Sequence, residues 1–202
     1  MTEVASHIAE QPWKVYGERI VYNDPWVQLA LVDVQPPGAD RFEYRSVRLP
    51  RVAVAVVLDD QDRVLMLWRY RVLASRWGWE LPGGIVDEGE QGTEAAAREV
   101  EEETGWRPGP LTHLITYQPT IGMVDAPHEV YLARHATKVG QPSDPMEAGK
   151  VEWINLGSIL ALLERDQLLS SGTLVGLLQV LAFRSKSPGG GNVNDAHPVD
   201  LR

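Results

Sequence analysis

Short stretches in which apolar and polar residues alternate occupy the first quarter of the chain. The clearest runs from Val27 to Val34, between breaks at Asn23-Asp24-Pro25 and Pro36-Pro37-Gly38. Alternation with a period of two is typical of half-buried strands, and Pro, Gly, Asn and Asp commonly end them. Residues 12–48 therefore predict a small antiparallel subdomain of two or three strands.

Continuous apolar runs follow at Val52–Leu58 and Val64–Trp68, joined by the polar turn Asp59–Asp62. Strands that are buried on both faces have this pattern, so we expect a hairpin at the centre of a sheet. The same reasoning predicts further strands at 111–117, 129–135 and 151–155. Leucine spacing predicts helices at 157–166 and 173–183, the first capped by Ser158.

A segment rich in Ala, Glu and Arg predicts one more helix, with an acidic face. Four of the five residues from Glu99 to Glu103 are acidic. At about 100° per residue, Glu99, Glu102 and Glu103 fall on one side of a helix. Like charges three or four residues apart cost a helix about 0.2–0.5 kcal/mol per pair unless a cation neutralises them. The acidic face therefore indicates a cation site.

The residue types around this face narrow the chemistry. Oxygen ligands suit hard cations such as Mg²⁺ or Mn²⁺, and the chain has no cysteine, which excludes a thiolate centre and a cysteine nucleophile. Before the helix, the glycines of Leu81-Pro82-Gly83-Gly84 let bare backbone approach a metal or a phosphate. After it, Gly105 predicts a left-handed stop.

The whole segment has a recognisable signature. Residues 84–106 resemble the Nudix box at every signature position, reading Gly84-x5-Glu90-x7-Arg98-Glu99-Val100-x-Glu102-Glu103-x-Gly105-Trp106. The resemblance implies an α/β (α+β) fold, the Nudix α/β/α sandwich with a mixed sheet. It also implies a reaction in which metal-bound water attacks a nucleoside diphosphate linked to a group X.

Carried over position by position, the resemblance implies roles for the box residues. Glu99, Glu102 and Glu103 would be the metal ligands, with the carbonyl of Gly83 as a further one, and Glu102 would also be catalytic. Arg98 and Glu90 would complete the catalytic group by orienting these carboxylates, because an Arg–carboxylate pair can be bidentate. An ordinary surface salt bridge is the alternative for Arg98.

A stretch rich in Gly and Pro, residues 140–149, predicts a flexible loop. In the related pyrophosphatases, the loop at this point carries an acidic residue that binds a metal or deprotonates water. Glu147, four residues before the strand that begins at Val151, matches that position. Asp144 and His128 are the alternatives for the base.

Regions outside the box resemble the ADP-ribose pyrophosphatase branch, over residues 13–183. The N-terminal strands, the run Leu67–Arg71 and the placement of Glu80 before the glycine loop carry this resemblance. It implies a homodimer in which the N-terminal strands help to build the interface and the nucleotide pocket. Arg71, Trp26 and Glu80 are the candidate substrate-binding residues. A strand-edge surface role for Arg71 and a packing role for Trp26 are the alternatives.

The chain differs from the ADP-ribose pyrophosphatase branch at two positions, so the resemblance does not specify the substrate. The branch usually carries Ala at the position of Gly83 and a Pro sixteen residues after Gly105, whereas here Pro119 is fourteen residues after it and Ile121 takes the sixteenth place. ADP-ribose or another nucleotide sugar is the predicted substrate. A housecleaning hydrolase of nucleoside triphosphates or dinucleoside polyphosphates is the alternative enzyme, and a non-catalytic nucleotide-binding Nudix domain is the alternative outside enzymes.

Composition limits the partners. A formal charge of −9 disfavours a nucleic-acid partner, because phosphate contacts need a cationic surface. With no secretory signal pattern at the start and no eighteen-residue apolar stretch, we expect a cytoplasmic protein without a membrane segment. The predicted organisation is a flexible N-terminus (1–11), the strand subdomain (12–48), the Nudix domain (49–186) and a disordered tail (187–202).

Overall fold

The computed structural model describes residues 11–143 and 149–185, which form two compact units. Unit 1 contains residues 11–51 and 117–127, and unit 2 contains the remaining described residues. Residues 117–127 therefore group with the N-terminal strands, although they lie inside the segment 49–186. The catalytic candidates Glu147 and Asp144 lie outside the described residues, as do residues 1–10 and the predicted tail.

Unit 1 is built on one four-stranded sheet, with the order β1-β2-β3-β10. Its strands are β1 (Lys14–Asn23), β2 (Gln28–Gln35), β3 (Phe42–Arg48) and β10 (Val124–Asp125). The first three are antiparallel neighbours, which confirms the predicted N-terminal strands, while β10 pairs in parallel with β3. The turn after β1 is held by Asp24, whose Oδ1 accepts the N–H groups of Trp26 and Val27, each at 2.8 Å.

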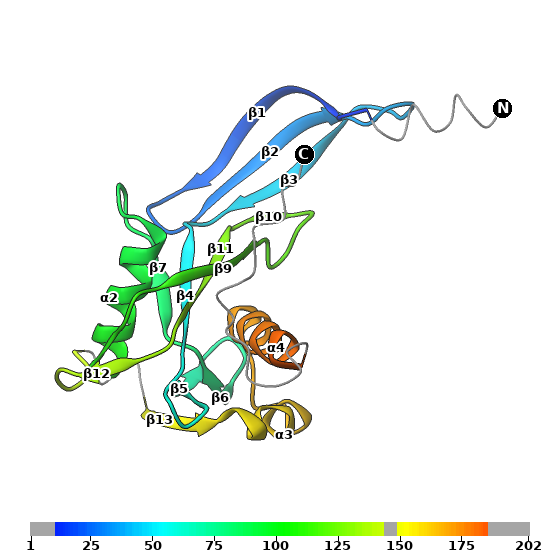
Figure 1. Ribbon diagram of the computed structural model, residues 1–202. Coiled ribbons are helices and arrows are strands. Elements are labelled where there is room, and N and C mark those ends of the chain that lie inside the picture. Colours follow the sequence, from blue (N-terminus) through cyan, green and yellow to red (C-terminus); the bar gives the residue numbers. More distant parts are fainter. Residues whose placement is uncertain (1–10, 144–148, 186–202) are drawn as a thin grey trace. The chain divides into compact units, whose positions relative to one another are not determined.

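Unit 2 contains two larger sheets and one small strand pair (Figure 1). The first sheet has the order β7 (Gly83–Ile85), β4 (Val52–Val57), β11 (His128–Ala133), β9 (Thr112–Tyr117). The second has the order β13 (Lys150–Asn155), β5 (Arg63–Arg71), β6 (Arg76–Glu80), and the small pair joins β8 (Trp106–Pro108) to β12 (Ala136–Lys138). Because β4 runs parallel to β11 and antiparallel to β7, the first sheet is mixed.

The predicted hairpin of 52–58 and 64–68 is wrong in one respect. Both runs are buried strands, but only the bridge between Leu58 and Val64 joins them, and β4 and β5 then belong to different sheets. Each strand is central in its own sheet: β4 lies between β7 and β11, and β5 lies between β13 and β6. The backbone groups of β4 and β5 therefore form hydrogen bonds with these neighbouring strands and not with each other.

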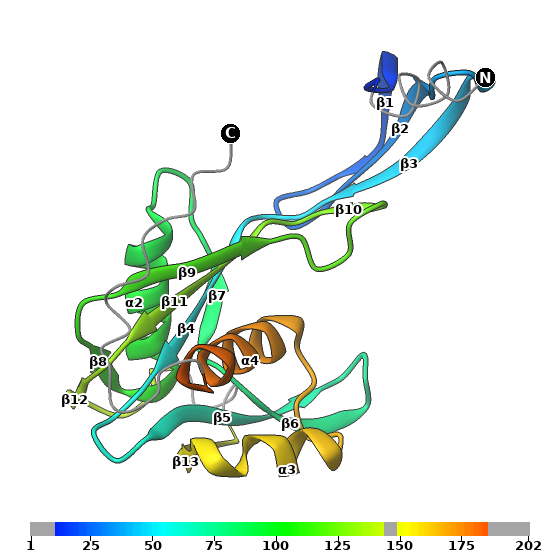
Figure 2. The ribbon, with the colours of Figure 1, turned by 45° about the vertical axis from the view of Figure 1, so that its right-hand side comes forward.

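Helices α2 (Gly92–Thr104) and α4 (Ser171–Ser185) cover opposite faces of β4 and β11 (Figure 2). On the α4 face, a Cβ added to Gly176 would lie 3.0 Å from Val56 and 3.2 Å from Val130, so this glycine lets the helix approach the sheet. Alternate residues of β4 face α2, and the core there contains Ala53, Ala55, Val57, Ala95, Ala96 and Val100. The predicted α/β/α sandwich is confirmed within unit 2.

The predicted helix at 157–166 consists of a 3-10 turn, η1 (Leu156–Ser158), followed by α3 (Ile159–Glu164). Asn155, rather than Ser158, supplies the cap, since its Oδ1 accepts the N–H of Gly157 at 2.8 Å. Ser158 already has helical backbone angles, so its hydroxyl is not placed at the helix entry. Among the described helices, none is long and apolar enough to cross a membrane.

Candidate functional site

Helix α2 has a hydrogen-bonded start and ends at the glycine that the sequence indicates. At its start, the N–H of Gln91 donates to the carboxylate of Glu94 at 3.0 Å. At its end, Gly105 has a φ of 68° and its N–H donates to the carbonyl of Glu101 at 2.8 Å. A Cβ on Gly105 would lie 2.4 Å from the carbonyl oxygen of Gly140, so both the angle and the space favour glycine. The predicted left-handed stop is confirmed.

Arg98 lies at the centre of a group of oxygen acceptors. Its Nε and Nη2 donate to the two carboxylate oxygens of Glu90, at 3.0 and 3.1 Å. Its Nη1 contacts Glu99 at 2.7 Å and Glu102 at 3.1 Å, and Nη2 also reaches the carbonyl of Ile85 at 3.0 Å. The bond from Arg98 lowers the pKa of Glu90, and the carboxylates raise the pKa of Arg98. Arg98 thus connects the loop before α2 to two carboxylates of the acidic face.

Glu103 is the buried member of the acidic face. Its side chain forms an ion pair with Arg69 of β5 through Oε1, and its Oε2 accepts the N–H of Gly83 at 2.9 Å. Burial raises the pKa of Glu103 to about 7, while Arg69 and the Gly83 N–H act in the opposite direction. Arg69 was not among the predicted site residues, although a charged residue at the end of a buried apolar run is a signal that can be seen in the sequence.

The structure places the predicted metal ligands at different depths. The side chains of Glu99 and Glu102 are 15% and 49% exposed, and that of Glu103 is 7% exposed. Over residues 11–143 and 149–185, no three acidic or histidine side chains converge as a ready metal cage. The two arginines keep the three carboxylates apart. Arg98 contacts Glu99 and Glu102, whereas the buried Arg69 contacts Glu103.

The donor set and the loop backbone nevertheless fit a hard divalent cation. Carboxylates and a peptide carbonyl are the ligands that Mg²⁺ prefers. The carboxylate of Glu99 occupies space that a side chain at Gly84 would need, since a Cβ there would lie 2.3 Å from its Oε1. The glycine loop and the helix are therefore close enough for carboxylate and carbonyl oxygens to share one ion.

We expect Gly84→Ala to lower activity strongly with a small effect on stability. The new methyl group would displace the flexible end of Glu99, and this costs little folding energy but moves a predicted ligand. Turnover and the melting temperature of purified protein measure the two effects separately. Activity near that of the wild type would show that the position of Glu99 is unimportant, and a large fall in melting temperature would show that the loop cannot adjust.

The structure brings together two of the three predicted substrate-binding residues. Arg71 donates through Nε and Nη2 to the two carboxylate oxygens of Glu80, the first bond measuring 2.8 Å. Glu80 is buried, whereas half of the Arg71 side chain is exposed, so Arg71 presents the surface that a ligand can reach. Trp26 lies in unit 1 and is 67% exposed.

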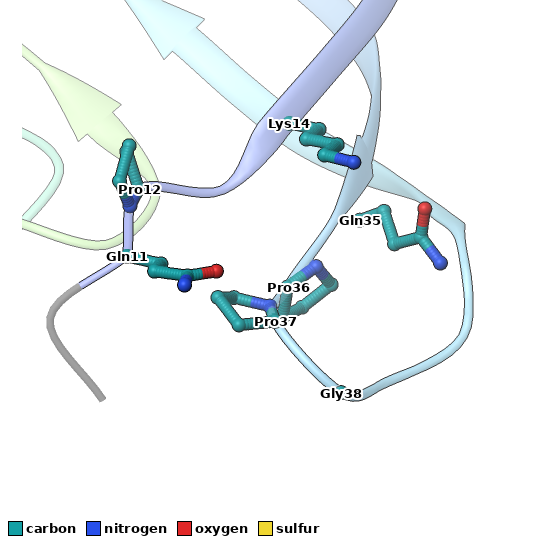
Figure 3. Close-up of a pocket in the computed structure, with 7 residues that line it drawn as sticks. All are labelled: Gln11, Pro12, Lys14, Gln35, Pro36, Pro37 and Gly38. Atoms are coloured by element: carbon teal, nitrogen blue, oxygen red, sulfur yellow. The ribbon is translucent and has the colours of Figure 1, made fainter. Parts of the chain in front are cut away.

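Two of the cavities in the described residues differ in their chemistry. One, of about 350 Å³, lies beside α2 and is lined by Ala97, Arg98, Glu101, Glu102 and Arg107. The other, of about 220 Å³, lies in unit 1 and is lined by Gln11, Pro12, Lys14, Gln35, Pro36, Pro37 and Gly38 (Figure 3). Among the described residues, the lining of the second cavity contains one cation and no carboxylate, so these residues offer no ligand set for a metal. The cavity beside α2 adjoins the candidate site.

Comparison with known proteins agrees with the geometry. The family model of the NUDIX domain matches residues 48–170. CMP-5'-(N-acetyl-N-hydroxy-3-aminopropyl)phosphonate hydrolase of Streptomyces rubellomurinus is 45% identical over 171 residues, which cover 85% of this chain and 83% of that protein. ADP-ribose pyrophosphatase of Mycobacterium tuberculosis is 32% identical over 178 residues, covering 87% of this chain and 86% of that protein.

A solved structure shows the same fold. The crystal structure of an ADP compounds hydrolase aligns with a TM-score of 0.76 and covers 87% of this chain and 95% of that one, at 21% identity. The family model spans more than half of the chain, and both relatives cover most of it. The chain therefore belongs to the Nudix family and is a hydrolase, and its resemblance to the ADP-ribose pyrophosphatase branch is confirmed.

Proposed function

We propose that this enzyme hydrolyses the diphosphate bond of a nucleoside diphosphate linked to X, with ADP-ribose or another nucleotide sugar as substrate and Mg²⁺ as cofactor. One observation carries the proposal: helix α2 places Glu99 and Glu103 against the Gly83-Gly84 loop, and Arg98 bonds Glu99 and Glu102 as well as the carbonyl of Ile85. This arrangement suits phosphoryl transfer, which depends on positioning and charge more than on a covalent nucleophile.

Glu99, Glu102, Glu103 and the carbonyl of Gly83 would hold Mg²⁺, with Mn²⁺ as a substitute. When bound, the metal lowers the pKa of a water molecule and neutralises charge on the diphosphate. The protein's own part is to orient the ligands. Arg98 fixes the Glu90 side chain through two bonds and so holds the loop before α2 against the helix.

We assign the role of general base to Glu102 or Glu147. Glu102 is half exposed, so its carboxylate can accept a proton from water. Glu147 lies outside the described residues, but the chain on either side of it is anchored near the site. The N–H of Ser143 donates to the carbonyl of Glu102 at 2.8 Å, and that of Gly149 donates to the carbonyl of Trp68 at 3.0 Å. Asp144, between the same anchors, is the alternative.

Arg71 is our candidate for binding the diphosphate or the terminal sugar. Its guanidinium is held by the buried Glu80, which orients it, and half of the side chain remains exposed to a ligand. Trp26 is our candidate for stacking on the base, because its ring is exposed and any nucleobase offers a flat face. Glu80 therefore contributes to substrate binding through Arg71.

A second candidate substrate follows from the relatives. The protein that is 45% identical over 85% of this chain is named for a CMP-linked phosphonate, and the 32% identical one for ADP-ribose. Both compounds contain a nucleoside monophosphate joined to a further group, so a CMP-linked phosphonate belongs in any substrate test.

The test is a substrate panel with Mg²⁺, with products resolved by chromatography. It should contain ADP-ribose, UDP- and GDP-sugars, NADH, a CMP-linked phosphonate, a dinucleoside polyphosphate and nucleoside triphosphates. We expect a nucleoside monophosphate as the dominant product, with ribose 5-phosphate beside AMP if ADP-ribose is the substrate. Preferential hydrolysis of triphosphates or dinucleoside polyphosphates would support the housecleaning alternative, and silence across the panel would contradict the proposed substrate class.

We also propose that the enzyme is a homodimer formed through unit 1. All ten residues of β1 are exposed, and three of its apolar side chains, Val15, Val21 and Tyr22, are at least 50% exposed. A strand with this composition usually contacts a partner. Sedimentation at micromolar concentration should show a dimer, and Val15→Asp combined with Val21→Asp should convert it to a monomer. A wild-type monomer would contradict the proposal.

A further inference from the structure

Arg69 is a buried charge whose position is defined by the active-site helix. It lies on β5, in the second sheet of unit 2, and is 4% exposed. Its Nη2 forms an ion pair with Oε1 of Glu103 on α2, which is 7% exposed. Removing two charges from water is costly, and their attraction offsets this cost only where the geometry is close and further hydrogen bonds are made.

The carboxylate of Glu103 is held on both sides. Arg69 of β5 bonds Oε1, and the N–H of Gly83 in β7 bonds Oε2 at 2.9 Å. Two donors from two different strands fix the rotation of the carboxylate about its last side-chain bond. With Gly83 alone, the group could turn away from the loop whose carbonyl is a proposed ligand.

A second arginine of β5 shows the same arrangement at the other end of the loop. Arg71, two residues along the strand, makes two bonds to Glu80, which directly precedes the loop 81–84. Residues two apart on a strand point to the same face. Two arginines on one face of β5 thus bond an acid that contacts the glycine loop, Glu103, and the acid that precedes it, Glu80. Of these two pairs, that of Arg69 includes a proposed metal ligand.

We propose that Arg69 is a positioning residue that sets the carboxylate of Glu103 against Gly83 for binding of the divalent cation. This inference rests on the proposed function, because it concerns the metal ligands of that site. In this role Arg69 acts through the carboxylate of Glu103. Its planar guanidinium reaches the carboxylate from a neighbouring sheet, which a shorter lysine with a single ammonium group does not reproduce.

The test is the affinity of the full-length protein for Mn²⁺, measured by electron paramagnetic resonance without substrate. The Arg69→Lys variant keeps the positive charge, so a change in its Mn²⁺ affinity would result from a changed position of the Glu103 carboxylate. We expect Mn²⁺ to bind about 10- to 100-fold more weakly. Arg69→Gln should also bind more weakly, although losing a positive charge would by itself favour the cation. Near-ultraviolet circular dichroism establishes that each variant is folded.

Arg63→Lys is the matched control. Arg63 lies at the start of the same strand and forms an ion pair with Asp59, distant in sequence from every proposed ligand. Its substitution should leave Mn²⁺ affinity and kcat unchanged. A second readout is the Mg²⁺ concentration that gives half-maximal activity, which should rise in Arg69→Lys while the KM at saturating Mg²⁺ stays near the wild-type value.

The outcomes separate this inference from the proposed function. Wild-type Mn²⁺ affinity in folded Arg69→Lys would overturn the positioning role, even if the enzyme hydrolyses its substrate as proposed. Failure of both variants to fold would also overturn it, since Arg69 would then serve stability. Weakened Mn²⁺ binding in an enzyme that is silent on the substrate panel would uphold the positioning role and overturn the proposed reaction.

Discussion

Glu102→Gln is expected to lower kcat by about 10²- to 10⁴-fold, the range for loss of a group that moves a proton in the reaction. The substitution keeps the shape of the side chain and removes its charge. Glu102 is 49% exposed and its ion pair is with Arg98 at 3.1 Å. Pairs of this exposure contribute little to stability, so the melting temperature should hardly change.

Glu101→Gln is the matched control for this prediction. Glu101 precedes Glu102 on α2, but its two oxygens accept bonds from Arg107, at 2.8 and 3.0 Å, whereas Glu102 pairs with Arg98. We expect turnover close to the wild type, measured under the same conditions. Equal losses in the two variants would mean that the helix tolerates no change there, and near-normal turnover of Glu102→Gln would remove Glu102 from the mechanism.

Arg98→Lys is expected to lower kcat/KM by about 10- to 100-fold, as for other residues that orient metal ligands. Lysine keeps the charge but cannot make the two bonds to Glu90 while also reaching Glu99 and the carbonyl of Ile85. The loop before α2 should loosen, and the melting temperature should fall by a few degrees. Steady-state kinetics and thermal unfolding measure both effects.

Arg107→Lys provides the comparison for Arg98→Lys. Arg107 also forms two bonds to a carboxylate, that of Glu101, but its side chain is 63% exposed. We expect nearly unchanged kinetics and stability. If Arg98→Lys behaved in the same way, Arg98 would be an ordinary surface ion pair, the alternative left open by the sequence.

Local patterns in the sequence were sufficient for several elements. Alternation predicted the N-terminal strands β1, β2 and β3 of unit 1, and the Ala- and Glu-rich segment ending at Gly105 predicted α2 with its stop. These features depend on neighbours a few residues away, such as the N–H of Gly105 and the carbonyl of Glu101. The resemblance to the Nudix box then gave the sandwich, because a fixed signature implies a known arrangement.

Features that depend on distant residues could not be predicted in this way. The apolar runs of β4 and β5 are buried as expected, but nothing in either run specifies which strand takes its edges. The ion pair of Arg69 and Glu103 joins residues 34 positions apart, and β10 reaches β3 from 77 positions away, as in the pairing of Val124 with Val47. Such contacts result from packing of the whole unit.

The most direct test of the account is the dependence of turnover on Mg²⁺ with the best substrate of the panel. Wild-type protein treated with a chelator and then dialysed should be inactive. Addition of Mg²⁺ or Mn²⁺ should restore turnover in the wild-type protein but not in the Glu102→Gln variant. Full turnover without a divalent cation, or equal restoration of Glu102→Gln, would contradict the claim that the acidic face of α2 is the catalytic metal site.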